Sequence, residues 1–323
     1  MLIERVCYIV VTDLHLNSHK QNRYNYFIEC LDVIDQIKQI ALSIHAKEKN
    51  LILLGDEVDR GKTSVDAYDK VLQLLKYLIN DFNKTYLVMG NHSKSYSKHN
   101  PIYSFIHSFE TDTVKSWNVK PLALVPEIEV LDRIEFKDVE FVFRHYGSNT
   151  QMISDKVGIL FMHDNLYPQE EEHRITYAHN KYIHPIDKFD FIFNGHLHTI
   201  RTQWTLGKTQ IHNLGSLLRT KAEEVFDSDL VRQIPIIYLE DGYLDTIKME
   251  KITLPPKEIV YKEDEYQEQH EKYILKKDLN EYKEYGKIFQ HDIVPLDMLD
   301  QSVQATYDIR VRALWSKIKG DLQ

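Results

Sequence analysis

The chain has 323 residues and a net charge of −9, and 43% of its residues are hydrophobic. This composition excludes disordered and collagen-like chains, because it supplies enough apolar surface for a full core. The apolar runs are far shorter than the ~20 residues that a membrane span needs, so we expect no membrane association.

The remaining bulk features favour a cytoplasmic protein. Cys7 and Cys30 cannot form a disulfide framework, which indicates a reducing compartment. Residues 1–5 lead straight into an apolar run, without the charged region and long apolar stretch of a signal peptide. The acidic balance counts mildly against a protein that coats DNA, since phosphate binding needs clustered Lys and Arg.

Short apolar runs rich in β-branched and aromatic residues predict strands, and their lack of polar alternation indicates burial on both faces. In chain order the expected strands are Val6–Val11, Leu51–Leu54, Tyr86–Met89, Phe141–Phe143, Ile159–Met162, Phe189–Phe193 and Ile234–Leu239. Tyr26–Ile44 and Val65–Ile79 carry apolar residues near a 3.6 period, which predicts helices. Strands alternating with helices are typical of an α/β sheet.

The character of the sequence changes after Leu239. Asp241-Gly242 predicts a turn, and residues 254–258 predict a linker or an extended edge. Residues 262–287 are dense in charged residues, which favours a solvated helix. Leu299–Ile318 carries apolar residues at spacings of three and four, which predicts a helix that packs on the chain's own body or on a partner.

Polar side chains follow five of the expected strands at the point where each strand ends. They are Asp13 and His15, then Asp56 with Asp59 and Arg60, then Asn91 and His92, then His163, and finally His196 and His198. In open α/β sheets, ligands bind outside the carboxyl ends of the strands. We therefore expect the five ends to converge on one crevice.

Oxygen and imidazole donors dominate this set, which suits Mn, Fe or Zn better than a soft metal. The seven donors are Asp13, His15, Asp56, Asn91, His163, His196 and His198. They exceed what one ion needs but suit two ions that share a carboxylate, as in two-metal phosphoryl transfer. Gly55, Gly90 and Gly195 are expected to let the backbone turn sharply and a phosphate approach closely.

Each motif alone has an ordinary structural explanation. Asp-x-His pairs arise by chance, and Gly90-Asn91-His92 also fits a turn or a helix cap. Gly-His-x-His is a stronger signal, because both imidazoles lie on one side of an extended strand end. Gly-Asp-x-x-Asp-Arg-Gly is the most specific motif. All five elements in order, each at a strand end, favour a catalytic site.

In this combination the sequence resembles the calcineurin-like metallophosphoesterase superfamily over residues 6–220. The resemblance implies an α/β fold, a two-sheet αββα sandwich with a dinuclear metal centre at one end and, in this chain, a short C-terminal α-helical extension. It implies that one metal is held by Asp13, His15, Asp56 and His198. The other metal would be held by Asp56, Asn91, His163 and His196, with Asp56 bridging the two ions.

The resemblance also implies roles around the reacting phosphate. His92 would protonate the leaving oxygen, and Asp59 would hydrogen-bond His92 and raise its pKa. Arg60 would either touch a substrate phosphate or form a structural salt bridge. The nucleophile would be a water activated by two metals, so no serine or cysteine is required.

Within the superfamily, Gly-Asp-Glu-Val-Asp-Arg-Gly resembles the Ser/Thr protein phosphatases, but the rest of the sequence departs from them and is similar to the Mre11/SbcD nuclease branch. Gly-His-Leu-His followed by Asn213–Arg219 carries this resemblance, and the opening Asp-Leu-His-Leu with Arg23 beyond it also fits. The compact length is similar to that of the phage-type recombination endonuclease small subunit. Ser93 departs from the pattern, since the branch has an acidic residue there.

This branch implies a DNA exo/endonuclease subunit that acts in repair, recombination or replication. Two divalent ions would serve it, first of all Mn²⁺, with Mg²⁺, Fe²⁺ or Zn²⁺ as alternatives. DNA and a Rad50/SbcC-like ATPase would be its partners, and a homodimer stays open. We expect a catalytic domain over 1–250 and an extension over 251–323, in a bacterial cytoplasm or a phage-infected host.

Two other functions are weighed against the nuclease. The first is a phosphodiesterase or phosphatase that acts on small nucleotides or phosphoesters. The second is a non-catalytic scaffold, which is disfavoured because no ligand position is missing from the sequence.

Overall fold

The computed structural model describes residues 4–16, 26–57, 65–91, 106–109, 125–146, 155–166, 186–198, 201–219, 231–256 and 260. The chain divides into two compact units, Met1–Glu265 and Tyr266–Gln323, and every described residue belongs to the first. The expected helix over 299–318 lies outside the described residues, as does most of the expected extension over 251–323. The domain boundary at residue 250 stays a prediction.

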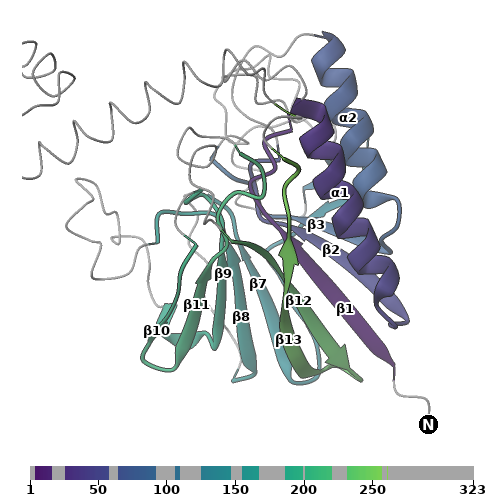
Figure 1. The fold of residues 1–323 in the computed structure, drawn as a ribbon. Coiled ribbons are helices and arrows are strands. Elements are labelled where there is room, and N and C mark those ends of the chain that lie inside the picture. The colour runs from purple at the N-terminus through teal and green to yellow at the C-terminus, as the bar shows by residue number, and fades with distance from the viewer. Residues whose placement is uncertain are drawn as a thin grey trace, which may run out of the picture. The chain divides into compact units, whose positions relative to one another are not determined.

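Two mixed β-sheets make up most of the described chain (Figure 1). The first sheet has the strand order β13-β12-β1-β2-β3-β5-β4. Its strands are β1 (Arg5–Val11), β2 (Glu48–Leu53), β3 (Lys84–Leu87), β4 (Ile106–Phe109), β5 (Val125–Val130), β12 (Arg232–Glu240) and β13 (Tyr243–Ile252). The strands β1, β2, β3, β5 and β4 run parallel, and β12 is antiparallel to both β1 and β13.

The second sheet has the strand order β10-β11-β9-β8-β7-β6. Its strands are β6 (Arg133–Glu135), β7 (Val139–Arg144), β8 (Val157–Met162), β9 (Phe191–Asn194), β10 (Gln203–Leu206) and β11 (Thr209–Asn213). The four inner strands are parallel, and each edge strand is antiparallel to its neighbour. A short 3₁₀ helix, η4 (Ile186–Lys188), precedes β9.

Alternate side chains of the central strands enter two different cores. In β1, Cys7, Ile9 and Val11 pack under the helices, whereas Tyr8 and Val10 face the second sheet. Because both faces of β1 are buried, its sequence is apolar without alternation, as the sequence predicted. A third cluster covers the outer face of the second sheet. The two-sheet α/β sandwich is therefore confirmed.

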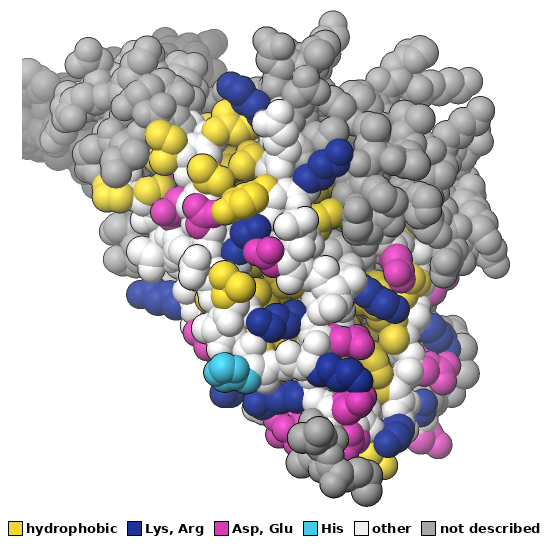
Figure 2. Space-filling view, turned by 90° about the vertical axis from the view of Figure 1, so that its right-hand side faces the viewer, with side chains coloured by type: hydrophobic (Ala, Val, Ile, Leu, Met, Phe, Trp, Pro, Cys, Tyr) yellow, Lys and Arg dark blue, Asp and Glu magenta, His cyan; other side chains and the backbone are white. Residues whose placement is uncertain are grey.

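Helices α1 (Tyr26–Ser43) and α2 (Val65–Ile79) lie side by side against the first sheet (Figure 1). Both were expected from their apolar periodicity. Lys38 ties the helices together, because its ammonium donates to the carbonyl of Tyr77 at 2.7 Å and pairs with Asp81 at 2.9 Å. Figure 2 shows the right-hand side of the view in Figure 1, where basic and acidic side chains are interspersed. None of the helices described is long and apolar enough to cross a membrane.

The sequence did not predict the edge strands β4, β6, β10 and β13 or the inner strands β5 and β11. β13 alternates between exposed and half-buried side chains, and β10 is largely exposed, so neither shows a continuous apolar run. The turn at Asp241-Gly242 is confirmed. It joins β12 to β13, and both residues have positive φ angles (51° and 86°), as a two-residue hairpin turn requires.

Parallel strands position the predicted donors. The carboxyl ends of β1, β2 and β3 lie at one edge of the first sheet, and those of β8 and β9 lie at one edge of the second. Each predicted ligand follows one of these five strands. The fold therefore brings side chains far apart in the sequence to a single place.

Candidate metal centre

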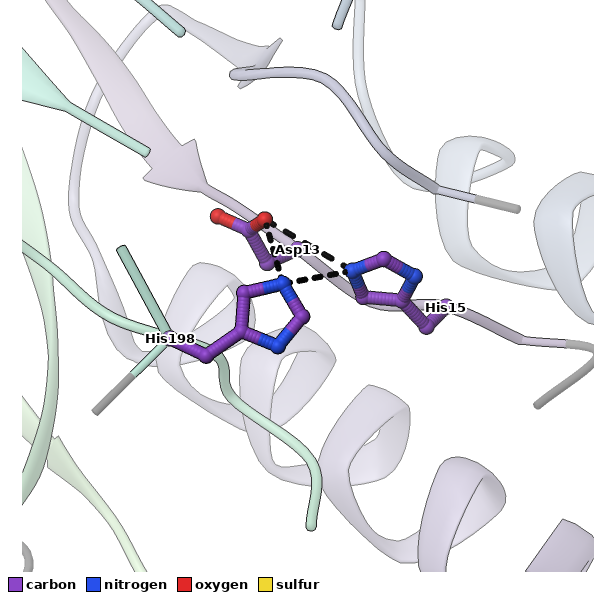
Figure 3. A group of neighbouring side chains, drawn as sticks. All are labelled: Asp13, His15 and His198. Atoms are coloured by element: carbon purple, nitrogen blue, oxygen red, sulfur yellow. Dashed lines mark hydrogen bonds and ion pairs between the residues drawn. The ribbon is translucent and has the colours of Figure 1, made fainter. Parts of the chain in front are cut away.

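One group of predicted ligands consists of Asp13, His15 and His198 (Figure 3). The Nε2 atoms of His15 and His198 are 3.0 Å apart, and they lie 3.6 Å and 3.3 Å from Asp13 Oδ1. Ligand atoms that lie ~2.1 Å from a shared ion are separated by roughly 3.0–3.4 Å. Two of the three separations lie in this range and the His15–Asp13 separation of 3.6 Å lies just above it, so the donor atoms are close to the spacing of ligands of one divalent cation.

The second group consists of Asp56, His163 and His196. His163 Nε2 is 3.1 Å from Asp56 Oδ2, and the Asn91 side-chain oxygen lies 3.0 Å from both His163 Nε2 and His196 Nδ1. Asn91 thus joins this group, as the resemblance implied. His163 Nε2 is also 4.0 Å from Asp13 Oδ1, so the two groups adjoin.

The environment of Asp13 fits a bound cation. Its Oδ2 atom accepts hydrogen bonds from Thr12 Oγ1 at 2.5 Å and from the backbone N–H of His196 at 2.9 Å. Its Oδ1 atom is buried and accepts no hydrogen bond among the described residues. A buried carboxylate oxygen that faces three imidazole nitrogens is suited to a metal ion.

The orientation of His163 is set by the backbone. Its Nδ1–H donates to the carbonyl oxygen of Leu54 at 2.6 Å, which directs Nε2 toward Asp56 and Asn91. A second hydrogen bond of this kind fixes the tautomer and the ring plane of a metal-binding histidine. His163 is therefore held in a conformation that a ligand requires before any ion arrives.

Opposing charges control protonation in the cluster. Burial alone would lower the pKa of His163, but the carboxylates of Asp56 and Asp13 outweigh it and raise the pKa to about 10. Burial and the nearby His163 charge lower the pKa of His196 to about 3. Burial would raise the pKa of Asp13, yet the His163 charge holds it well below its usual range. In the metal-free chain a proton on His163 thus balances the carboxylates, and a cation would displace it.

Four of the predicted ligands have left-handed backbone conformations. The φ angles are 48° at Asp13, 43° at His15, 55° at Asp56 and 75° at His196. Non-glycine residues rarely adopt positive φ, and such outliers gather at functional sites. The strand ends turn sharply at these residues, which points their side chains inward.

Glycine is required beside the ligands because a side chain would displace them. At Gly90 an added Cβ would collide with the carboxylate of Asp56 and lie 2.7 Å from its backbone nitrogen. At Gly195 it would collide with the hydroxyl of Thr12 and lie 2.9 Å from Asp13 Oδ2. These two glycines make room for the ligands themselves, whereas the sequence suggested room for a phosphate. Only Gly55 of the three has a positive φ, at 88°.

Several residues around the donors were not predicted from the sequence. Thr12 and the buried Glu57 flank ligands, and burial together with the Asp56 charge raises the pKa of Glu57 to about 8. His145 and Tyr146 follow β7 as the predicted ligands follow other strands, which is a signal that could have identified them. Tyr146 lies 5.8 Å from the His196 ring, and its N–H donates to the Met89 carbonyl at 2.8 Å.

Three further predicted site residues lie outside the described part of the chain. They are His92, the expected general acid, Asp59, its expected partner, and Arg60, the expected phosphate contact. Their roles stay predictions. The proposed bridging by Asp56 also stays a prediction, since its carboxylate is grouped here with His163 and His196 alone.

Comparisons with known proteins point to one family. A family model described as calcineurin-like phosphoesterase matches residues 8–199. No curated protein matches the chain. Its α/β fold is similar to that of a dimetal phosphatase from Danio rerio, with 14% identity over 76% of this chain and 95% of the other and a TM-score of 0.47.

Two other solved structures are similar at the same level. Phosphopantetheinyl hydrolase from Mycobacterium tuberculosis is 12% identical over 78% of this chain and 98% of its own, with a TM-score of 0.41. Vacuolar protein sorting 29 from Cryptosporidium parvum is 12% identical with the same coverage and a TM-score of 0.34. Identity this low bears on the fold alone.

Proposed function

Because this chain belongs to the calcineurin-like phosphoesterase family, we propose that it is the catalytic subunit of a metal-dependent DNA nuclease. Hydrolysis of a phosphoester is the activity of the family. The observation that carries the proposal is the pair of adjoining donor groups, Asp13-His15-His198 and Asp56-His163-His196, at the carboxyl ends of strands from both sheets.

The residues of the chain have distinct tasks in this proposal. Asp13, His15 and His198 would hold one divalent ion, and Asp56, His163, His196 and Asn91 would hold the other. When bound, two such ions lower the pKa of water and neutralise charge on the transferring phosphoryl group. The chain supplies the fixed geometry, and His92 supplies the proton to the departing oxygen. Mn²⁺ is the proposed metal, since the donors are oxygen and imidazole nitrogen.

DNA is proposed as the substrate on the basis of the sequence beyond the ligands. Gly-His-Leu-His followed by Asn213–Arg219 is similar to the Mre11/SbcD nucleases, and the residues that follow Asn91-His92 and His163 differ from those of the Ser/Thr phosphatases. In the same proposal the segment over 299–318 docks a Rad50/SbcC-like ATPase in the cytoplasm. Deletion of residues 297–323 should then abolish co-purification with the ATPase while the remaining chain stays folded. An insoluble truncated chain would show instead that this segment packs on its own body.

A second candidate is a phosphodiesterase or phosphatase for small nucleotides. The net charge of −9 favours it, because DNA binding depends strongly on Lys and Arg contacts to phosphates. A small substrate needs no extended basic surface. The two candidates share the metal centre and differ only in what reaches it.

One assay separates the candidates. The purified chain with Mn²⁺ is offered linear duplex DNA, single-stranded DNA and a small aryl phosphodiester, with and without the ATPase partner. Cleavage of DNA supports the nuclease, whereas turnover of the small diester alone refutes it. An Asp13→Asn variant should lose all activity, because the ion loses its carboxylate. A His92→Ala variant with full activity would contradict the role of His92 as the general acid.

A further inference from the structure

Ser216 lies between two predicted metal ligands that come from different sheets. It follows β11 and is fully buried. Its backbone N–H donates to the carbonyl oxygen of His198 at 3.1 Å. Its hydroxyl lies 3.0 Å from the carbonyl oxygen of Asp13 and 2.8 Å from that of Leu218. These two carbonyl oxygens share the single hydroxyl proton as acceptors. Asp13 follows β1 of the first sheet, and His198 follows β9 of the second.

The segment that carries Ser216 is itself fixed at both ends. Arg201 Nη2 donates to the carbonyl oxygen of Ser216 at 2.5 Å. Gly215 has a φ of 70°, and a Cβ there would lie 2.5 Å from Arg201 Cγ. Only glycine at this position leaves room for the Arg201 side chain. Downstream, the Arg219 guanidinium pairs with the buried carboxylate of Glu29 at 2.6 Å. Residues 215–219 therefore form a strap that Arg201 and Glu29 anchor in addition to its contacts with Asp13 and His198.

The strap matters because the Asp13 backbone is in an unfavourable conformation. Its φ of 48° persists only if surrounding contacts hold it. The Asp13 carboxylate is held through Oδ2 by Thr12 and His196, and the Asp13 carbonyl is held by Ser216. Without the Ser216 hydroxyl, the turn can relax and carry Asp13 Oδ1 away from His15 and His198.

We propose that Ser216 is a positioning residue that holds Asp13 and His198 together, so that the Asp13-His15-His198 group can bind a divalent cation. The inference rests on the proposed function, because it requires that this group is a metal site. It assigns no contact with the ion to Ser216. Groups behind metal ligands typically contribute 10–100-fold to metal affinity.

The test is a Mn²⁺ titration of the metal-free full-length chain by calorimetry, with bound Mn²⁺ counted by electron paramagnetic resonance. Wild type should bind two ions. Ser216→Ala should bind one of them roughly tenfold or more weakly, with the other unchanged. Thr209→Val is the matched control, because Thr209 also has a buried hydroxyl that donates to a backbone carbonyl, that of Phe189 at 2.6 Å. Thr209→Val should bind both ions as wild type does, whatever it loses in stability.

The outcomes separate this inference from the proposed function. If wild type binds two ions and Ser216→Ala binds both with wild-type affinity, the positioning role is wrong and the metal centre stands. Equal weakening by Thr209→Val would also refute it, since the effect would then be general destabilisation. If wild type binds no Mn²⁺, both proposals fail. If the Ser216→Ala variant does not fold, the Arg201→Met variant is used in its place. Mn²⁺ binding by Arg201→Met with wild-type affinity would overturn the role of the strap.

Discussion

His145 is expected to make the stability of the metal-free chain depend on pH. The side chain is fully buried after β7, and its Nδ1 atom accepts the backbone N–H of Met89 at 3.0 Å. Burial lowers its pKa from 6.5 to about 4. A proton on Nδ1 would place two N–H donors face to face and detach Met89, which follows β3 and lies two residues before Asn91.

The sign and size of the effect follow from that pKa. The folded pKa lies below the unfolded value, so on acidification the unfolded chain binds the proton first. The contribution of His145 is complete above pH 6.5 and is lost as the pH falls toward 4. The gap between 6.5 and about 4 corresponds to about 3 kcal/mol in the free energy of unfolding.

His145→Asn is the variant that isolates this effect. The Asn side-chain oxygen can replace Nδ1 as the acceptor for Met89, and it does not titrate. Urea unfolding of both proteins in a chelator, from pH 4 to pH 8, gives the measurement. The wild-type free energy should fall relative to the variant by up to about 1.4 kcal/mol per pH unit below 6.5. Parallel curves for the two proteins would refute the assignment.

Three further predictions concern the metal centre and its support. Gly90→Ala should weaken Mn²⁺ binding at least tenfold, because the added Cβ displaces Asp56. Gly207→Ala is the control and should not weaken binding, because its Cβ would meet nothing within 4 Å. Equal Mn²⁺ binding by both variants in a titration would contradict this prediction. Arg219→Met should lower the free energy of unfolding by about 3–5 kcal/mol, because it leaves the Glu29 carboxylate buried without its charge partner. Adding Glu29→Gln should restore part of that loss in urea unfolding. Saturating Mn²⁺ should raise the thermal midpoint of unfolding. At a Mn²⁺ concentration of 100 times the dissociation constant, binding at one site adds about 2.7 kcal/mol to the free energy of unfolding, and a chelator should reverse the rise.

The sequence predicted the strands β1, β2, β3, β7, β8, β9 and β12 together with the donors, because both leave local signals, whereas the inner strands β5 and β11 were not predicted. A strand buried on both faces is a continuous apolar run, and each donor directly follows such a run. The edge strands β10 and β13 leave no such signal, because one face is open to solvent. Phe189 was expected in a strand, but it follows η4 and packs on the outer face of the second sheet. Apolar character reports burial and does not by itself report conformation.

Contacts between distant segments could not be predicted. Ser216 meets Asp13 across 203 positions, and Arg219 meets Glu29 across 190. Residues 213–219 carry a family resemblance in the sequence, but the link between Ser216 and the ligands depends on how the two sheets pack. The positive φ of Asp13 could not be predicted either, because the residue type alone does not determine a left-handed backbone conformation.

The left-handed backbone at four predicted ligands has an evolutionary consequence. Each such residue costs on the order of 1–3 kcal/mol, which the rest of the fold must offset. Glycine at Asp13 or Asp56 would relieve that cost and remove the donor at the same step. Substitutions chosen for thermostability alone would therefore tend to remove these donors. Directed evolution of a more heat-resistant form should screen for catalysis in every round.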